Sequence, residues 1–343
     1  MRPLSPDPVA VADRSPYLVQ ERGELSCAVT DALRSGGLPR WAPGAVLEAD
    51  VWGEDLQLAL YLLYELPYRG FDGVDDAREW DPELLRLRQA MEARFLEALR
   101  TELFDAPRTV EDAFAPLLVE PVDLSGSLSH HLETEGQLWQ LREYAALRSL
   151  YHLKEADPHA WVIPRLTGRA KAAMVAIEYD EFGAGHADRI HAQLFADLMT
   201  DLGLDPTYGR YLDQAPAPLL AGVNLMSLFG LHRALRGALV GHFACVEVTS
   251  SPGSRRLAKA MRRCGAGSAA EHFYAEHVEA DAVHEQVVRH EVIGGLLVDE
   301  PGLEEDIAFG CAATVRLEDR LASHIREAWD HERSALRTPL HQP

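Results

Sequence analysis

The sequence lacks the cysteine patterns that mark disulfide frameworks and zinc sites. Its four cysteines are scattered, and none belongs to a CxxC pair: they are Cys27, Cys245, Cys264 and Cys311. We expect ordinary reduced thiols, because structural zinc sites and disulfide scaffolds need characteristically spaced cysteines. No stretch approaches the roughly 20 consecutive apolar residues that a membrane-spanning helix requires, so we expect no membrane partner.

Basic residues are also scarce. The 343 residues include 33 Lys and Arg against 54 Asp and Glu, which gives a formal net charge of -21. A surface this acidic repels phosphate backbones and anionic lipids, so nucleic acid is not an expected partner. Residues 1–20 carry repeated prolines and one early arginine, without the apolar core of a secretory signal. We interpret this stretch as a flexible arm of a cytoplasmic protein.

Alternating strand patterns are nearly absent, and helix patterns dominate. Apolar residues recur at helical spacing in 54–65, in 81–104 and in several longer segments of the second half. With 47% hydrophobic residues, the chain can bury a sizeable core. The predicted fold class is all-α. We expect a helical region over 21–125 that packs on a core over 126–343. Proline and glycine thicken around 106–127, which indicates either a boundary or only a long connection.

One helical stripe combines imidazole and carboxylate side chains. In EHVEADAVHE (276–285), His277, Asp281 and His284 stand at i, i+4 and i+7, so they project from a helix in nearly one direction. Neutral imidazole and carboxylate are the usual ligands of first-row divalent ions, which favours a metal site. The helix carries further glutamates on other faces, so a solvated acidic surface is the alternative interpretation.

A second segment, 177–195, carries similar groups. Asp188 and His191 are three residues apart, a spacing that helical bundles use to direct two ligands at a di-iron site. Glu181 precedes Asp188 by seven residues, so an unbroken helix would add it to the same stripe. The intervening glycines predict a break, which would turn Glu181 either toward the metal or away from it.

The preceding helix offers two competing carboxylates, Glu143 and Glu155. They are 12 residues apart, which is about 120° around a helix, so they cannot face the same point. The helical wheel places Glu143 in the middle of the apolar arc and Glu155 at its edge, beside Tyr151. Burial therefore favours Glu143 as the inward carboxylate, unless it pairs with a neighbouring arginine.

Four features together resemble the heme-oxygenase-like di-iron oxidases and oxygenases, and more narrowly the actinobacterial proteins called iron-containing redox enzymes. The features are KEADPH (154–159), the Glu181, Asp188 and His191 block, LFGLHRALRGALVGHFACVE (228–247), and the stripe from His277 to His284. The resemblance is strongest over about 130–335. It implies a heme-oxygenase-like helical bundle with two irons held between three core helices.

The resemblance also implies a ligand set. The expected iron ligands are Glu155, Glu181, Asp188, His191, His277, Asp281 and His284. Glu155 is preferred to Glu143 because its distance of 36 residues from His191 resembles the family's spacing, although the wheel argument favours Glu143. Many relatives carry a glutamate where this chain has Asp188. Glu247 and Tyr151 are expected beside the ligands, and no catalytic residue beyond the ligands is expected.

The expected function is that of a non-heme di-iron enzyme with two Fe2+ per chain and O2 as co-substrate. Its partners would be an electron donor and a small molecule similar to an amino acid or a fatty acid. Relatives perform N-oxygenation, desaturation or oxidative C–C cleavage, and a homodimer is common among similar bundles. The alternatives are a heme protein with His232 or His242 as the iron ligand, a metal-free thiaminase-like protein, and a non-catalytic binding protein.

Overall fold

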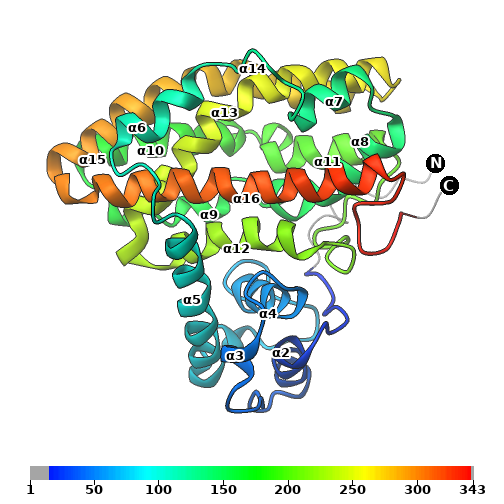
Figure 1. Ribbon diagram of the computed structural model, residues 1–343, viewed down its shortest axis with the longest axis vertical. Coiled ribbons are helices and arrows are strands. Elements are labelled where there is room, and N and C mark those ends of the chain that lie inside the picture. Colours follow the sequence, from blue (N-terminus) through cyan, green and yellow to red (C-terminus); the bar gives the residue numbers. More distant parts are fainter. Residues whose placement is uncertain (1–14, 341–343) are drawn as a thin grey trace, which may run out of the picture.

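The computed structural model describes residues 15–340, and this part of the chain consists of helices and connecting segments without a β-strand (Figure 1). The all-α prediction is confirmed. Most of the expected arm over 1–20 lies outside the described residues. Residues 15–20 are bound to the rest of the chain, since Ser15 Oγ donates to the Arg69 carbonyl (2.8 Å) and Gln20 N donates to Asp213 Oδ1 (3.0 Å).

The helices form an N-terminal group and a larger core. The N-terminal group contains α2 (Glu24–Ser35), α3 (Ala45–Glu48), α4 (Glu54–Glu65), η1 (Asp76–Trp80), α5 (Pro82–Glu102), α6 (Val110–Phe114) and η2 (Ala115–Leu118). The core contains α7 (Leu128–Thr134), α8 (Leu138–His152), α9 (Asp157–Ala160), η3 (Ile163–Arg165), α10 (Gly168–Glu181), η4 (Gly183–Gly185), η5 (Ala187–Arg189), α11 (His191–Asp201), α12 (Ala217–Leu231), η6 (Arg233–Leu235), α13 (Arg236–Arg263), α14 (Ser268–Val287), the π-helix η7 (Val288–Ile293), α15 (Gly294–Asp299), η8 (Pro301–Leu303) and α16 (Glu304–Asp330).

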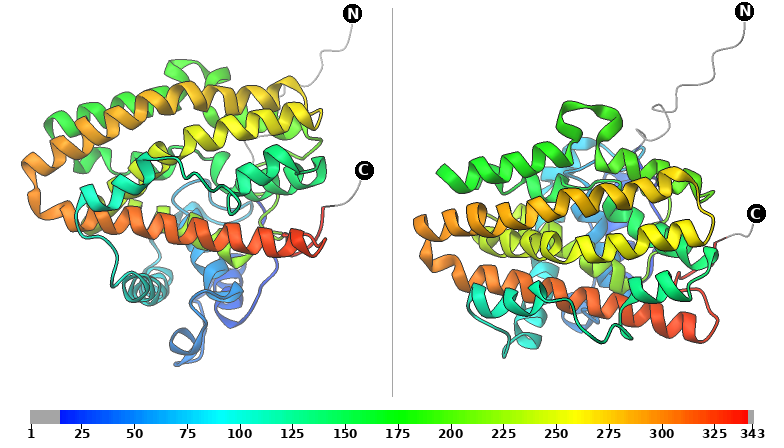
Figure 2. Two further views of the ribbon diagram at one scale, coloured as in Figure 1. Left: turned by 45° about the horizontal axis from the view of Figure 1, so that its top comes forward. Right: turned by 90° about the horizontal axis from the view of Figure 1, so that it is seen from above.

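Three long helices form the centre of the core. Helix α13 packs between α14 and α16, and the three run roughly parallel in Figure 2. Helix α11 packs against α14 as well, and Asp201 at its end accepts hydrogen bonds from Ala269 N (2.7 Å) and Ala270 N (3.2 Å) in the first turn of α14. A side chain of one helix thus caps the next, because the first N–H groups of a helix have no partner within it. This cap fixes α14 relative to α11.

The N-terminal group is packed on the core rather than separate from it. Helix α4 lies against α12, and α5 extends below the core in Figure 1. The connection that follows α5 crosses the core surface, where α6 contacts α16 and η2 contacts α13. The proline-rich stretch between the two groups is therefore a long connection along the core and not a free linker. None of the described helices combines the length and the apolar character needed to cross a membrane.

Two glycines allow α13 and α16 to approach closely. A Cβ atom on Gly241 would collide with the Ile307 carbonyl, and one on Gly310 would collide with the Ala238 carbonyl. Both collisions involve backbone atoms, which cannot move aside as a flexible side chain can. The short distance between these helices therefore depends on glycine at both positions.

We expect Gly241→Ala to destabilise the protein by about 1–3 kcal/mol, because an added methyl group in a packed interior forces the backbone to shift. The free energy of unfolding, measured in urea, checks this expectation. Gly253→Ala on the same helix is the matched control, since no atom lies within 4 Å of the added Cβ. It should be neutral or slightly stabilising, because alanine favours a helix more than glycine does.

Candidate metal centre

Three separate segments of the chain bring six side chains into two compact groups. The first group is Glu155, His191 and His277, and the second is Glu181, Asp281 and His284. In each group, one ligand atom per residue lies within 4.8 Å of the others. All six side chains are buried. These are six of the seven residues expected to bind iron.

Helix α14 supplies half of the cluster. His277, Asp281 and His284 are 2–7% exposed, whereas Glu279 on another face of the helix is exposed. The stripe therefore faces the interior, against α10, α11 and α13. The alternative interpretation, a solvated acidic face, is wrong for these three side chains.

The chain breaks between the two ligands that α10 and α11 provide. Glu181 is the last residue of α10 and His191 is the first of α11, with η4 and η5 between them. Gly183 has a φ of 74°, which turns the chain out of the helix at low cost because glycine has no Cβ. This turn carries Asp188 to the surface, where it is exposed and belongs to neither group. The structure therefore does not bring the seventh expected ligand to the cluster.

The carboxylate from the preceding segment is Glu155 and not Glu143. Helix α8 ends at His152, so Glu155 lies in the following turn and the helical wheel does not describe its direction. Glu143 is buried elsewhere, where its Oε2 accepts hydrogen bonds from Trp329 Nε1 (3.0 Å) and Ala335 N (2.9 Å). Its role in the structure is to hold the chain at the end of α16.

Hydrogen bonds orient the candidate ligands. The Nδ1–H of His277 donates to the Phe273 carbonyl (2.7 Å), which leaves Nε2 free on the side of Glu155, 3.7 Å from its Oε2. His284 Nε2 lies 3.4 Å from Asp180 Oδ2, which leaves its Nδ1 free. Such outer partners select the tautomer and ring orientation of histidines that bind metals.

The carboxylates are held in a similar way. His152 Nδ1 lies 2.9 Å from Glu155 Oε1, and Ser250 Oγ donates to Asp281 Oδ2 (2.5 Å). In each case one oxygen is engaged by a neighbour, and the carboxylate cannot rotate freely. The second oxygen of Glu155 has no hydrogen-bond partner among the described residues.

Glu181 connects the two groups. Its Oε2 lies 2.7 Å from His191 Nδ1 in the first group, and its Oε1 lies 3.4 Å from His284 Nδ1 in the second. Glu247 on α13 adds a fourth carboxylate, with Oε2 3.3 Å from His284 Nδ1. Glu181 thus lies between the two groups, with one oxygen toward a histidine of each.

The cluster fits metal ions because its buried donor atoms lack other partners. Five of them make no hydrogen bond within the described residues: Glu155 Oε2, His191 Nδ1, Glu247 Oε2, His277 Nε2 and His284 Nδ1. An unpaired buried polar atom is costly, and one without a partner calls for an explanation such as an ion. A mixed set of imidazoles and carboxylates is suited to iron.

The pKa values of the cluster reflect the close packing of its buried acids and imidazoles. Burial opposes the charge on His277, yet the nearby Glu155 carboxylate raises its pKa to about 10. Burial likewise opposes the charge on His284, but Glu247 raises its pKa to about 9. Burial also raises the pKa of Glu247 to about 8. Without a metal, protons supply the positive charge that the packed acids need.

Sequence reasoning did not single out two residues beside the cluster, Glu178 and His152. Glu178 lies one turn before Glu181, and burial, together with the charges of Glu181 and Glu247, raises its pKa to about 9. His152 orients Glu155 from three residues away. The i, i+3 spacing of each pair was a signal that could have identified both. Tyr151, expected beside the ligands, is buried at this end of α8.

A cavity of about 450 Å3 adjoins the cluster. It is lined by Glu155, Glu181, Glu247, His277 and Asp281 and extends between aromatic and aliphatic side chains of α8, α13, α14 and α16. Its volume lies in the range of small-molecule sites. The candidate ligands therefore border a space in which a small molecule can meet them.

The two histidines considered as heme ligands lie outside both groups. His232 Nε2 lies 3.0 Å from Glu92 Oε2, a buried carboxylate of α5. His242 is buried, and its Nδ1 lies 2.7 Å from Thr314 Oγ1. Neither contacts the clustered carboxylates through an ion pair or hydrogen bond in the described chain.

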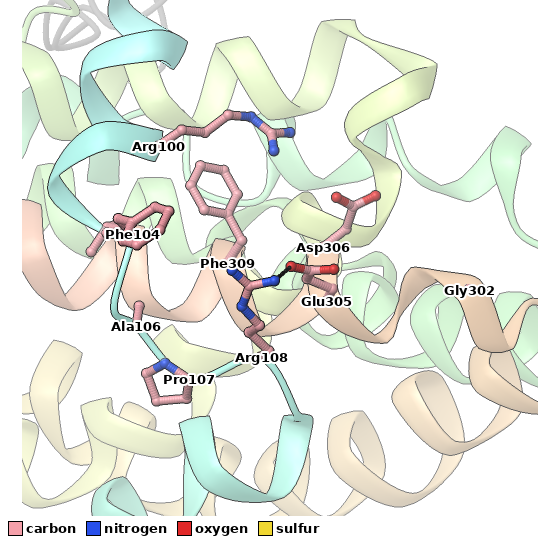
Figure 3. Close-up of a pocket in the computed structure, with 10 residues that line it drawn as sticks. Arg100, Phe104, Ala106, Pro107, Arg108, Gly302, Glu305, Asp306 and Phe309 are labelled. Carbon is pink, nitrogen blue, oxygen red and sulfur yellow. Dashed lines mark ion pairs between the residues drawn. The ribbon is translucent and has the colours of Figure 1, made fainter.

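A second pocket, between the end of α5 and the start of α16, has a different character (Figure 3). Arg108 pairs with Glu305 (3.1 Å), and the Arg100 guanidinium lies 5.1 Å from the centre of the Phe309 ring. None of the residues that line this pocket belongs to either candidate metal group. The buried cluster is therefore the candidate functional site.

A buried ion pair supports the segment that carries Glu155. Lys154 Nζ lies 2.8 Å from Glu65 Oε2 on α4, and Tyr208 OH donates to Glu65 Oε1 (2.6 Å). The side chains of Lys154 and Glu65 are 1% and 0% exposed, so each charge depends on the other. The N-terminal group thus contributes directly to the position of a candidate ligand.

We expect Lys154→Met to destabilise the protein by about 3–5 kcal/mol, because it leaves the Glu65 carboxylate buried without its partner. It should also lower the iron content, since Glu155 is the adjacent residue. Urea unfolding and metal analysis of the purified protein measure the two effects. Lys259→Met, which breaks an exposed pair with Glu133, is the control and should cost about 0–1 kcal/mol with unchanged iron content.

The segment that carries the candidate metal ligands matches a known protein family. The sequence pattern of a protein family described as iron-containing redox enzyme matches residues 142–319, just over half of the chain. The matched stretch includes both candidate metal groups, Asp188 and Glu247. A comparison with curated proteins gave no match.

Proposed function

Because the chain belongs to the iron-containing redox enzyme family, we propose that it is a non-heme di-iron enzyme that uses O2 to oxidise a small organic molecule. The single observation that carries the di-iron proposal is the position of Glu181, with one oxygen toward each of two adjoining three-residue groups. A site for one ion would need only one of these groups.

The charges of the cluster support two ions rather than one. Glu155, Glu181, Asp281 and Glu247 carry four negative charges when ionised, which two Fe2+ ions would neutralise. Burying four carboxylates with a single divalent ion would leave a net charge in the interior, which is strongly unfavourable. Two ions therefore match the chain's own donor set.

The residues of the chain would have distinct roles around such a pair. His277 and His284 would hold the ions through their free ring nitrogens, while Phe273 and Asp180 fix the two rings. The aromatic and aliphatic walls of the adjoining cavity would keep water from the bound organic molecule. When bound, a pair of ferrous ions supplies electrons to O2, and an external electron donor would restore them.

Oxygen reactivity of the iron-loaded protein tests the proposal. The anaerobic protein should take up about two Fe2+ per chain, as in other di-iron bundles. Mössbauer spectra recorded before and after admission of O2, with an electron donor absent, should change from ferrous to ferric for the bound iron. Asp281→Asn, which weakens one group, should show less bound iron and a smaller change. Bound iron that remains ferrous in air would contradict the proposal.

A further inference from the structure

One histidine that lines the cavity lacks hydrogen-bond partners within residues 15–340, and the candidate metal site does not explain this. His159 on α9 lines the cavity and is 1% exposed, and neither of its ring nitrogens has a hydrogen-bond partner among the described residues. Its ring lies 4.7 Å from the ring centre of Phe243 and 6.0 Å from that of Tyr151. A polar ring held against apolar walls without a partner costs free energy, unless a ligand supplies the missing hydrogen bond.

The neighbouring His242 has a defined tautomer. The Thr314 hydroxyl donates to the Gly310 carbonyl (2.8 Å), so its oxygen can only accept from His242 Nδ1, 2.7 Å away. A hydroxyl has a single hydrogen, and this arrangement fixes the tautomer of His242 with an unprotonated Nε2. The rings of His242 and His159 lie 5.2 Å apart. Burial, reinforced by His242, also lowers the pKa of His159 well below its usual value, so the ring is neutral.

No arginine or lysine of the described chain that lines the cavity is free to pair with an anion. Among the described residues that line it, Arg148 is the single arginine or lysine, and Glu318 already engages it through two contacts (2.9 and 2.6 Å). Asp319 adds a further acid at the exposed edge of the cavity. A carboxylate or phosphate bound away from the metal cluster would lie beside Glu318 and Asp319 without a counter-charge, which is costly in a buried site.

We propose that the cavity binds an uncharged, mostly apolar substrate whose single hydroxyl or amide group hydrogen-bonds to His159. The apolar part of this substrate lies along Tyr151, Met226 and Phe243, and its reacting carbon lies toward the clustered carboxylates. This inference rests on the proposed function, because it treats the cavity as the substrate site of the metal centre. It differs from the amino-acid- or fatty-acid-like substrate that the resemblance implied, since both of those carry a carboxylate.

Three probes of equal chain length test the inference: octan-1-ol, octanamide and octanoate. Isothermal titration at pH 7.5 is performed on the metal-free and on the iron-loaded protein. We expect the alcohol and the amide to bind, and octanoate to bind at least about tenfold more weakly. Equal or tighter binding of octanoate, or no binding of any probe, would overturn the inference.

Substitution of the histidine gives a second, independent measurement. His159→Phe keeps an aromatic ring and removes both nitrogens, and it should weaken octanol binding by about tenfold, the value of one buried hydrogen bond. His159→Gln, which retains a donor and an acceptor, should bind octanol more tightly than His159→Phe. His272→Phe at an exposed position of α14 is the control and should not change binding. Unchanged binding in His159→Phe would also overturn the inference.

The two proposals fail in different ways. Iron content and the reaction with O2 report on the metal centre, and His159 belongs to neither candidate metal group, so His159→Phe should retain wild-type iron. A protein that selects octanol over octanoate but takes up no iron would refute the proposed function alone. A protein that loads iron and reacts with O2 but prefers octanoate would refute the substrate inference alone.

Discussion

Glu181→Gln is expected to remove both iron ions. Glu181 directs one oxygen to each group, so its loss weakens the binding of both ions. Loss of His191 or His284 directly weakens the binding of only one ion. Substitution of residues that only orient metal ligands costs about 10–100-fold in affinity, and loss of a shared ligand should exceed that range. We therefore expect iron to fall from about two per chain to nearly none after desalting.

The control for this variant lies one helical turn earlier. Glu178→Gln changes a carboxyl group on the same helix whose pKa is raised to about 9 by burial and by the neighbouring acids, so this group is already neutral at pH 7. Glutamine resembles a protonated glutamate, and the variant should keep its iron. Plasma emission spectroscopy of both purified variants gives the comparison. Iron loss in Glu178→Gln together with retention in Glu181→Gln would exchange the roles assigned to them.

Metal affinity should rise steeply with pH. Despite burial, Glu155 raises the pKa of His277 to about 10 and Glu247 raises that of His284 to about 9. Both rings are therefore protonated on both nitrogens, and positively charged, at pH 7 without metal. A metal binds only the neutral ring, so each ion displaces one of these protons. Below these pKa values the affinity for each ion should therefore rise at least about tenfold per pH unit. The rise should level off above about pH 9 for the ion at His284 and above about pH 10 for the ion at His277.

Mn2+ titrations at pH 6, 7 and 8 measure this dependence without oxidation of the metal. Proton release in a weakly buffered solution provides a direct count, and we expect one proton from each of the two histidines and, below about pH 8, a further proton from Glu247. Glu143→Gln, which lies outside both groups, should show the same slope as the wild type. An affinity that is independent of pH would mean that these imidazoles are neutral before the metal binds.

The α14 stripe could be predicted because helical periodicity is a local property. Spacing alone placed His277, Asp281 and His284 on one face, and the structure adds that this face is buried. Spacing could not reveal the burial, since the surrounding glutamates are equally compatible with a surface helix. The packing of α14 on α11 and α13 decides it.

Predictions that assumed an unbroken helix were less successful. The outward position of Asp188 follows from the turn at Gly183, which has a φ of 74°. No sequence pattern predicts this angle. The choice of Glu143 by burial assumed that α8 continued to Glu155, but the helix ends at His152. The direction of Glu155 depends instead on Lys154 and its partner Glu65, which is 89 residues away along the chain.

The hydrogen bonding of His242 and His159 could not be predicted from the sequence either. His242 was considered as a possible heme ligand, yet its Nδ1 has a hydrogen-bond partner in Thr314. His159 was noted only as the last residue of the KEADPH motif. Its lack of any partner depends on α9, α13 and α16 meeting around one cavity, and no local pattern predicts such a meeting.

Anomalous diffraction at the iron edge from crystals of the iron-loaded protein tests the central claim most directly. The account predicts two peaks about 3.5–4 Å apart, as in other two-metal sites. One should lie among Glu155, His191 and His277 and the other among Glu181, Asp281 and His284. A single peak, no peak among these six side chains, or iron at His232 or His242 would contradict it.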